Sequence, residues 1–253
     1  MGKLILNGKI YTGNSADGFP PLIYSDDERE IGVWTNGKPL YQRTFQGSLT
    51  PSAGSAVIFS ANDYGIEQVV EADGYIKETS TGYFMQIGGY VNSRHQTGWF
   101  SQGDGTFLIY YSELYNYYSV TVKYTKTADV AGSGKWSTNG GTTHHYSTNE
   151  QVIGTWIDGK PLYEKTLEIT SLSSGNNTIS HGITNVDAIV YASGMFFSNA
   201  NNTTPIPNGD LNSSYNLRMY DFGVNDFKLA FGSGYVQYLT KVVVILQYTK
   251  TTD

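Results

Sequence analysis

The chain has 253 residues, no cysteine and a formal net charge of −6, and its 16 lysines and arginines are scattered along the sequence. A disulfide scaffold and a cysteine-ligated zinc site are therefore excluded, and without a basic stripe we expect no nucleic-acid partner. With 29 glycines, 21 tyrosines and only 15% charged residues, the composition is typical of short strands joined by tight turns. We expect almost no helix.

Residues 1–23 are interpreted as a separate N-terminal arm with one short strand at Leu4–Tyr11. The first residues, MGKLILNGKIYTG, hold too few apolar side chains for a signal peptide or a membrane span. We therefore expect a soluble protein, made in the cytoplasm, that reaches the cell exterior by another route such as lysis. The arm is either a surface strand of the first domain or an attachment or oligomerisation segment.

The next segment of the chain is repeated later in the sequence. Tyr24–Phe45 and Tyr146–Leu167 are identical at 12 of 22 positions, 122 residues apart. The closing segments Lys123–Asp129 and Gln247–Asp253 also match, 124 residues apart. The repeat predicts two tandem modules related by internal duplication, at residues 24–129 and 146–253, joined by a Gly/Ser/Thr-rich linker at residues 130–145.

Each opening segment has the pattern of a β-hairpin. Its turn pair is Asn36-Gly37 in the first copy and Asp158-Gly159 in the second, and both pairs favour a type I′ turn. A proline follows each turn and cannot donate to a strand ladder, so we expect the hairpin at a sheet edge.

Further strands are expected between these opening and closing segments. In the last strand of the second module, Lys241–Tyr248, apolar residues occupy both faces from Val242 to Leu246, which indicates a strand covered on both sides. Six to eight short strands per module predict an all-β fold of two tandem β-sandwich or jelly-roll-like modules. The other expected strands are Ser55–Ser60, Gln68–Glu71, Tyr75–Lys77, Tyr83–Val91, Thr106–Tyr111, Tyr118–Thr125, Asn185–Tyr191, Met195–Ser198, Leu217–Phe222, Phe227–Phe231 and Tyr235–Thr240.

No motif for catalysis is present: nucleophile elbows, phosphate loops and HExxH sequences are all absent. His144 and His145 are adjacent, so on a strand they point to opposite faces and do not easily share a metal. The acidic run Asp26–Glu28 is interpreted as a solvated lead-in to the first strand. We therefore predict a non-enzymatic protein with no catalytic residue, no metal site and no cofactor.

Aromatic side chains carry the strongest binding signal. Five tyrosines crowd residues 110–118, shortly after Trp99-Phe100, and on any strand part of such a set faces outward. Outward rings stack on sugars, and neighbouring polar groups add hydrogen bonds. The alternative is that these rings pack in the core or between subunits. The candidate ligand-binding residues are Arg94, His95, Trp99, Tyr111, Tyr115 and Tyr117.

The pattern IGxWxxGKPLY followed by YTKTTD resembles a module of bacteriophage and prophage virion proteins, including tail-fibre-like and baseplate-associated proteins. The residues that match are Ile31, Gly32, Trp34, Gly37–Tyr41, Tyr124–Asp129, Ile153, Gly154, Trp156, Gly159–Tyr163 and Tyr248–Asp253. The second copy adds Gly182-Ile183 and Asn185–Asp187, where the first departs to Gly65–Val69. The resemblance covers about 210 residues. It implies a virion protein that is exposed outside the host and oligomeric.

Together these features predict a phage appendage protein of the virion that contacts host surface polysaccharide. We expect a homo-oligomer, with a trimer favoured, that also contacts other virion proteins and does not insert into membranes. The alternative is a purely structural virion protein, such as a head fibre, decoration, collar or baseplate adaptor, without glycan binding.

Overall fold

The computed structural model describes residues 3–6, 9–12, 25–50, 52, 54–88, 90–92, 95–101, 105–111, 114–134, 144–199, 203–209, 214 and 216–252. Residues 3–6, 9–12, 90–92, 95–101 and 208–209 are described by their backbone alone. Strands dominate these residues, and the two helices among them, α1 (Ala61–Tyr64) and α2 (Ser233–Val236), are single turns. The expected all-β class is confirmed.

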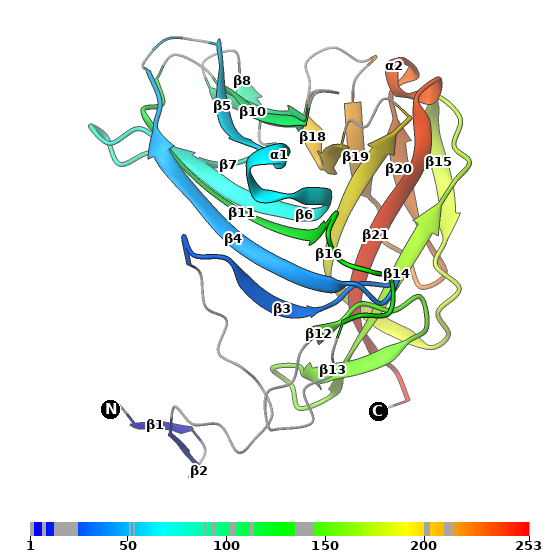
Figure 1. Cartoon of the computed structure of the whole chain (residues 1–253). Helices are drawn as coiled ribbons and strands as arrows, with labels where there is room; N and C mark the ends of the chain where they lie inside the picture. The colour runs from blue at the N-terminus through cyan, green and yellow to red at the C-terminus, as the bar shows by residue number, and fades with distance from the viewer. Residues whose placement is uncertain are drawn as a thin grey trace.

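The first half is a β-sandwich of two sheets (Figure 1). Its larger sheet has the order β12-β3-β4-β11-β6-β7: β12 (His144–His145), β3 (Arg29–Val33), β4 (Pro39–Ser48), β11 (Tyr117–Lys126), β6 (Ile66–Lys77) and β7 (Phe84–Gln86). The smaller sheet has the order β5-β10-β9-β8: β5 (Gly54–Ser60), β10 (Thr106–Tyr111), β9 (His95–Ser101) and β8 (Tyr90–Asn92).

The second half has the same strand order. One sheet runs β13-β14-β21-β16-β17: β13 (Gln151–Thr155), β14 (Pro161–Ile169), β21 (Leu239–Lys250), β16 (Val186–Ser198) and β17 (Thr203–Ile206). The other runs β15-β20-β19-β18: β15 (Gly175–Ser180), β20 (Asp226–Phe231), β19 (Asn216–Tyr220) and β18 (Asn208–Gly209). Each strand from β3 to β11 therefore has a counterpart from β13 to β21 in the same position.

The N-terminal arm differs from the expectation of one strand at Leu4–Tyr11. Two short strands, β1 (Lys3–Leu6) and β2 (Lys9–Thr12), pair antiparallel with Leu6 opposite Lys9. In the sequence, Asn7-Gly8 stands between them, a pair that favours two-residue hairpin turns, and it lies outside the described residues.

The predicted hairpins form, but their turns are not type I′. Gly37 and Gly159 have positive φ, at 78° and 91°, whereas the residue before each glycine does not. In the first copy the Trp34 carbonyl accepts from the Gly37 N–H at 2.8 Å, which is the three-residue loop with a glycine bulge. The Asn36 side chain accepts from the Lys38 N–H at 3.0 Å, so it stabilises this turn without adopting positive φ itself.

The repeated residues build the same cluster in both halves. In the first, Glu28 accepts from the Tyr124 hydroxyl at 2.7 Å and pairs with Lys126 at 2.6 Å. In the second, Glu150 accepts from Tyr248 at 2.6 Å and pairs with Lys250 at 2.5 Å. Glu28 is thus a partner of the closing strand, and interpreting its run as a solvated lead-in was wrong for this residue.

The strand expected to be covered on both faces lies between the two halves. In β21, Val242, Val244 and Leu246 belong to the core of the second sandwich. The alternate residues Val243 and Ile245 belong to the core of the first half. The two sandwiches therefore pack directly on one another, and the two-sided apolar pattern is explained.

The ends of the predicted linker are bound to the first half. The Gly134 N–H donates to the Gly37 carbonyl at 2.8 Å, and β12 pairs parallel with β3. Residues 135–143 lie outside the described part of the chain. Because β12 covers β3, the first hairpin is not at an edge, whereas β13 of the second hairpin is the outermost of the described strands in its sheet.

Candidate functional site

Two of the six predicted ligand-binding residues are part of the core. The rings of Tyr111 and Tyr115 are buried, with 3% and 0% of their surface exposed, and the Tyr111 hydroxyl donates to the Thr50 carbonyl at 2.9 Å. Strand alternation turns Tyr110 outward instead, at 42% exposure. A surface stacking role for Tyr111 and Tyr115 was therefore wrong, and the alternative of core packing holds for them.

Three of the other predicted residues cannot be placed as site residues. Arg94 lies outside the described residues, and only the backbone is described for His95 and Trp99, both in β9. Tyr117 is the remaining one, and it is half-buried at the start of β11.

Tyr117 belongs to a group of rings on the outer face of the larger sheet of the first half. Its ring centroid lies 6.3 Å from that of Tyr75, which lies 6.3 Å from that of Phe84. Tyr75 is 39% exposed and Phe84 is 70% exposed. We call Tyr75, Phe84 and Tyr117 the aromatic platform.

Strand register explains why these rings meet. Tyr117 of β11 lies opposite Lys77 of β6, which lies opposite Phe84 of β7, so all three side chains project from one face. Tyr75 stands two residues before Lys77 and shares that face. Three adjacent strands therefore each contribute one aromatic residue to the platform.

Polar side chains border the platform. The Tyr117 hydroxyl donates to Gln46 Oε1 at 2.6 Å, and the Gln86 amide donates to Asp73 Oδ1 at 3.3 Å. Burial and the neighbouring Tyr75 raise the pKa of Tyr117, so this phenol stays neutral at physiological pH. Exposed rings beside amide and carboxylate groups suit a polar, ring-shaped ligand such as a sugar.

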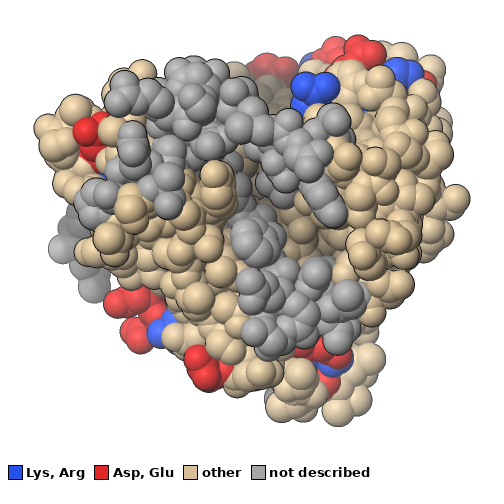
Figure 2. Space-filling model, turned by 90° about the horizontal axis from the view of Figure 1, so that it is seen from above, with Lys and Arg blue, Asp and Glu red and all other residues tan. Residues whose placement is uncertain are grey.

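The corresponding face of the second half is covered. Val243 and Ile245 of β21 occupy the positions of Ser119 and Thr121 of β11, and they are buried against the first half. Among the described residues, the aromatic platform therefore occurs in the first half alone. Figure 2 shows another feature of the surface: the charged groups among the described atoms form small, separate groups on a mostly uncharged face.

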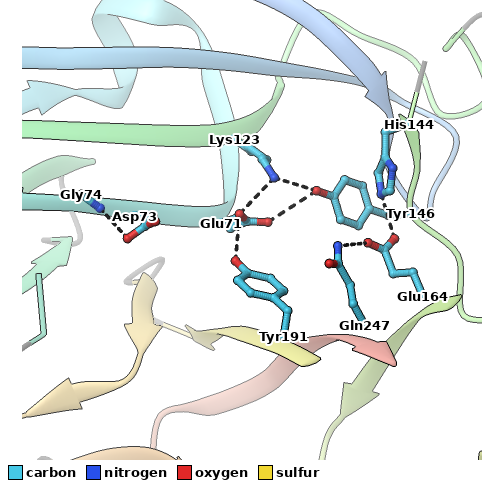
Figure 3. Close-up of polar contacts among 9 residues, drawn as sticks. All are labelled: Glu71, Asp73, Gly74, Lys123, His144, Tyr146, Glu164, Tyr191 and Gln247. Carbon is cyan, nitrogen blue, oxygen red and sulfur yellow. Dashed lines mark hydrogen bonds and ion pairs between the residues drawn. The ribbon is translucent and has the colours of Figure 1, made fainter. Parts of the chain in front are cut away.

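A second cluster of polar side chains lies where the two halves meet (Figure 3). Lys123 Nζ lies 3.0 Å from Glu71 and donates to the Tyr146 hydroxyl at 2.9 Å. The Tyr191 hydroxyl donates to Glu71 at 3.5 Å from the other half. Nearby, His144 Nε2 and Glu164 lie 2.8 Å apart, and Gln247 donates to the same carboxylate at 3.1 Å.

The protonation states of this junction cluster suit a structural contact between the two halves. Burial opposes the charge of Lys123, but Tyr146 and Glu71 raise its pKa well above the ordinary value, so the amine stays protonated. Burial raises the pKa of the Tyr146 phenol, which stays neutral. A protonated amine and a neutral phenol are poor nucleophiles and poor bases, and here they connect strands of the two halves.

Of the platform residues, Tyr117 alone was predicted from the sequence, and the junction cluster was not predicted. The platform rings are spread over residues 75–117 and become neighbours only through strand pairing. For the equivalent clusters around Glu28 and Glu150, the sequence did hold a signal, because a glutamate stands at the same position of both repeats.

Among the described residues, no group of three or more histidine, aspartate or glutamate side chains is placed to hold a metal ion. His181 is buried, where its Nδ1 accepts from the Ile183 N–H at 3.1 Å. No helix in the described part of the chain has the length and apolar character to cross a membrane. Comparison with protein-family models, with curated proteins and with solved structures finds no match.

Proposed function

We propose that this chain is a non-enzymatic virion appendage protein of a bacteriophage that binds carbohydrate on the host cell surface through the aromatic platform. The observation that carries the proposal is the row of the exposed Tyr75 and Phe84 and the half-buried Tyr117 on one sheet face, bordered by Gln46 and Asp73. The viral setting is proposed from the resemblance of the repeated motifs to phage and prophage virion modules.

The physical properties of the platform favour a weak, repeated binding mode. Three rings on adjacent strands form a short, open surface, which suits a few sugar units of a long polymer. Weak sites gain avidity when an oligomer presents several copies to one polymer, because the second binding event becomes intramolecular. A homo-oligomer, with a trimer favoured, would provide these copies on the virion outside the cell.

The two halves would be copies of one module, derived by internal duplication, that have taken different roles. The matching strand orders and the matching Glu28 and Glu150 clusters support this origin. In the second copy the face equivalent to the platform is apolar and packs on the first copy. The first module would thus carry recognition and the second would support it.

The second candidate is a purely structural virion protein, such as a head fibre, decoration, collar or baseplate adaptor. The observation in its favour is that half of the aromatic side chains of the described residues are buried in the cores, including Tyr111 and Tyr115. In that case Phe84 and Tyr75 would bury against another virion protein and not against a sugar.

Binding to a panel of capsular and cell-wall polysaccharides separates the two candidates. We expect Tyr75→Ala and Phe84→Ala to weaken binding about tenfold each, since losing about 1.5 kcal/mol of aromatic contact corresponds to roughly tenfold in Kd. Tyr238→Ala is the matched control, because Tyr238 has a similar exposure of 41% but lies in the second half. If no polysaccharide binds, or if all three variants bind like the wild type, carbohydrate recognition by the platform is excluded.

A further inference from the structure

The aromatic platform has a lysine between two of its rings. β11, β6 and β7 lie side by side in the larger sheet of the first half (Figure 1). Lys77 of β6 stands opposite Tyr117 of β11 on one side and opposite Phe84 of β7 on the other. Directly opposite residues share one face of a sheet, so the Lys77 side chain leaves the sheet between the two rings. Because a lysine keeps its ammonium group in water while its stem packs on its neighbours, the half-buried Lys77 presents a positive charge on the platform.

The neighbouring row of side chains on this face is polar and uncharged around the third ring. Ser119 of β11 lies opposite Gln46 of β4 on one side and Tyr75 of β6 on the other. Tyr75 in turn lies opposite Gln86 of β7. Two amides and a hydroxyl therefore surround the Tyr75 ring, and such groups both donate hydrogen bonds to sugar hydroxyls and accept them. The row of Lys77 differs because it offers a full positive charge between rings.

The two acidic residues nearest to Lys77 along β6 do not neutralise this charge. Asp73 lies four residues before Lys77, or about 13 Å along the strand, where its carboxylate accepts from the Gly74 N–H at 2.7 Å. Charges on a surface are largely screened beyond a Debye length of about 8 Å at physiological salt. Glu71 lies farther away and pairs with Lys123 at 3.0 Å. The positive charge of Lys77 therefore dominates its end of the platform.

Glu78 follows Lys77 in the chain but faces the other side of the sheet. Its N–H donates to the Tyr83 carbonyl at 2.8 Å, so the ladder continues past Lys77 and alternation directs the Glu78 side chain away from the platform. The Glu78 carboxylate accepts from the two hydroxyls of Ser80–Thr81 at 2.9 and 2.8 Å. Burial and the charge of Glu78 raise the pKa of the core residue Tyr115, as expected for a carboxylate on the core side.

The second module has apolar residues at the corresponding positions. Phe197 and Met195 of β16 occupy the positions of Lys77 and Tyr75 of β6, because they pair with the equivalent residues of the closing strand. Both are buried and belong to the core that includes the first half. The module thus folds with a phenylalanine where the first copy has Lys77, so the fold itself does not require a lysine there.

We propose that the platform binds saccharides that carry an anionic group, with the Lys77 ammonium paired to that group. This inference rests on the proposed function and names the class of carbohydrate. An ammonium group is a compact point charge with three donors, and it pairs with a carboxylate or a phosphate alike. A uronic acid and a phosphate-substituted sugar therefore share the chemistry that Lys77 recognises.

The strand spacing indicates how such a chain would lie. Tyr117 and Phe84 stand on strands two spacings apart, which separates their backbones by about 10 Å, with Lys77 midway. A saccharide that runs across the strands would place sugar rings on Tyr117 and Phe84 and an acidic substituent over Lys77. Its hydroxyls would reach the amides of Gln46 and Gln86 beside Tyr75.

The first experiment compares the binding of matched acidic and neutral oligosaccharides to the full chain by isothermal titration calorimetry. One pair is a uronic acid oligosaccharide and its carboxyl-reduced form, and the other is a phosphate-substituted oligosaccharide and its dephosphorylated form. We expect the acidic member of at least one pair to bind about fivefold more tightly, which is the upper range for an exposed ion pair. The preference should weaken as salt is added, because salt screens the pair. Equal binding within both pairs would overturn this inference but leave carbohydrate recognition standing, whereas no binding of any oligosaccharide would overturn both.

The second experiment assigns the preference to Lys77. Lys77→Met removes the charge and keeps an unbranched apolar stem, so the acidic preference should disappear while the neutral members bind as to the wild type. Lys77→Arg should retain the preference. Lys228→Met is the matched control, because Lys228 is a half-buried lysine of β20 in the second half and its loss also removes one positive charge from the net −6. A preference that survives Lys77→Met, or that Lys228→Met abolishes equally, would contradict the proposal.

Discussion

Replacement of the two equivalent tryptophans by alanine tests how the linker segment stabilises the first module. Trp34 is 1% exposed and is covered by Tyr146, whereas Trp156 is partly exposed and no described residue covers it in the same way. A buried tryptophan removes about 150–250 Å² from water, or roughly 4–6 kcal/mol at 25 cal/mol/Å² as an upper bound. We therefore expect Trp34→Ala to cost about 3–5 kcal/mol of the free energy of unfolding.

The same change in the second copy should cost less. We expect Trp156→Ala to cost about 1–2 kcal/mol, since partial burial forfeits only part of the transfer free energy. The assay is urea unfolding at a protein concentration low enough to keep the chain monomeric, followed by circular dichroism. Equal losses for Trp34→Ala and Trp156→Ala would refute the reasoning, because they would show that β12 and Tyr146 add nothing to the burial of Trp34.

Three further predictions concern the junction, the repeated glutamate and the β12 edge. Lys123→Met should destabilise the protein by about 3–5 kcal/mol because it leaves the Glu71 carboxylate without its cationic partner at the junction, and adding Glu71→Leu should recover most of the loss in urea unfolding. Burial raises the pKa of Glu150, but hydrogen bonds from Lys250 and Tyr248 lower it overall, below 4.5. The ionised Glu150 therefore stabilises the folded state above pH 4.5, and this contribution is lost as the pH falls through the folded-state pKa. Glu150→Gln should thus destabilise the protein at pH 7 and flatten its acid unfolding curve. An unchanged curve counts against this role of Glu150. Gly32→Ala should release β12 and accelerate hydrogen exchange at the Tyr146 N–H, whereas Gly154→Ala should leave it unchanged; protection that survives Gly32→Ala would contradict the geometry.

Local pattern and internal repetition predicted much of the fold. Alternation and turn residues located most strands, and the two-sided apolar run of Val242–Leu246 correctly indicated a strand with cover on both faces. The strand expected at Tyr235–Thr240 was wrong, because α2 covers Ser233–Val236 and β21 begins only at Leu239. The type I′ assignment failed because Asn-Gly serves two turn types. At Asn36 the side chain caps the Lys38 N–H, which favours the three-residue loop.

The candidate site was harder to predict because it depends on strand register. The density of tyrosines at residues 110–118 could not show which rings face outward, and the structure buries Tyr111 and Tyr115 while it exposes Tyr110. Tyr75 and the pair Tyr83-Phe84 lie far in sequence from the dense tyrosines at residues 110–118, so no local pattern groups them with Tyr117. Their proximity to Tyr117 follows from the pairing of β6 with β7 and β11, which a single sequence does not specify.

The most direct test of the central claim is saturation-transfer NMR between a bound polysaccharide and the ring protons of the protein. The account predicts transfer from the sugar to the rings of Tyr75, Phe84 and Tyr117, with loss of the signal in Tyr75→Ala and its retention in Tyr238→Ala. Transfer to rings elsewhere on the protein, with none to these three, would contradict the account.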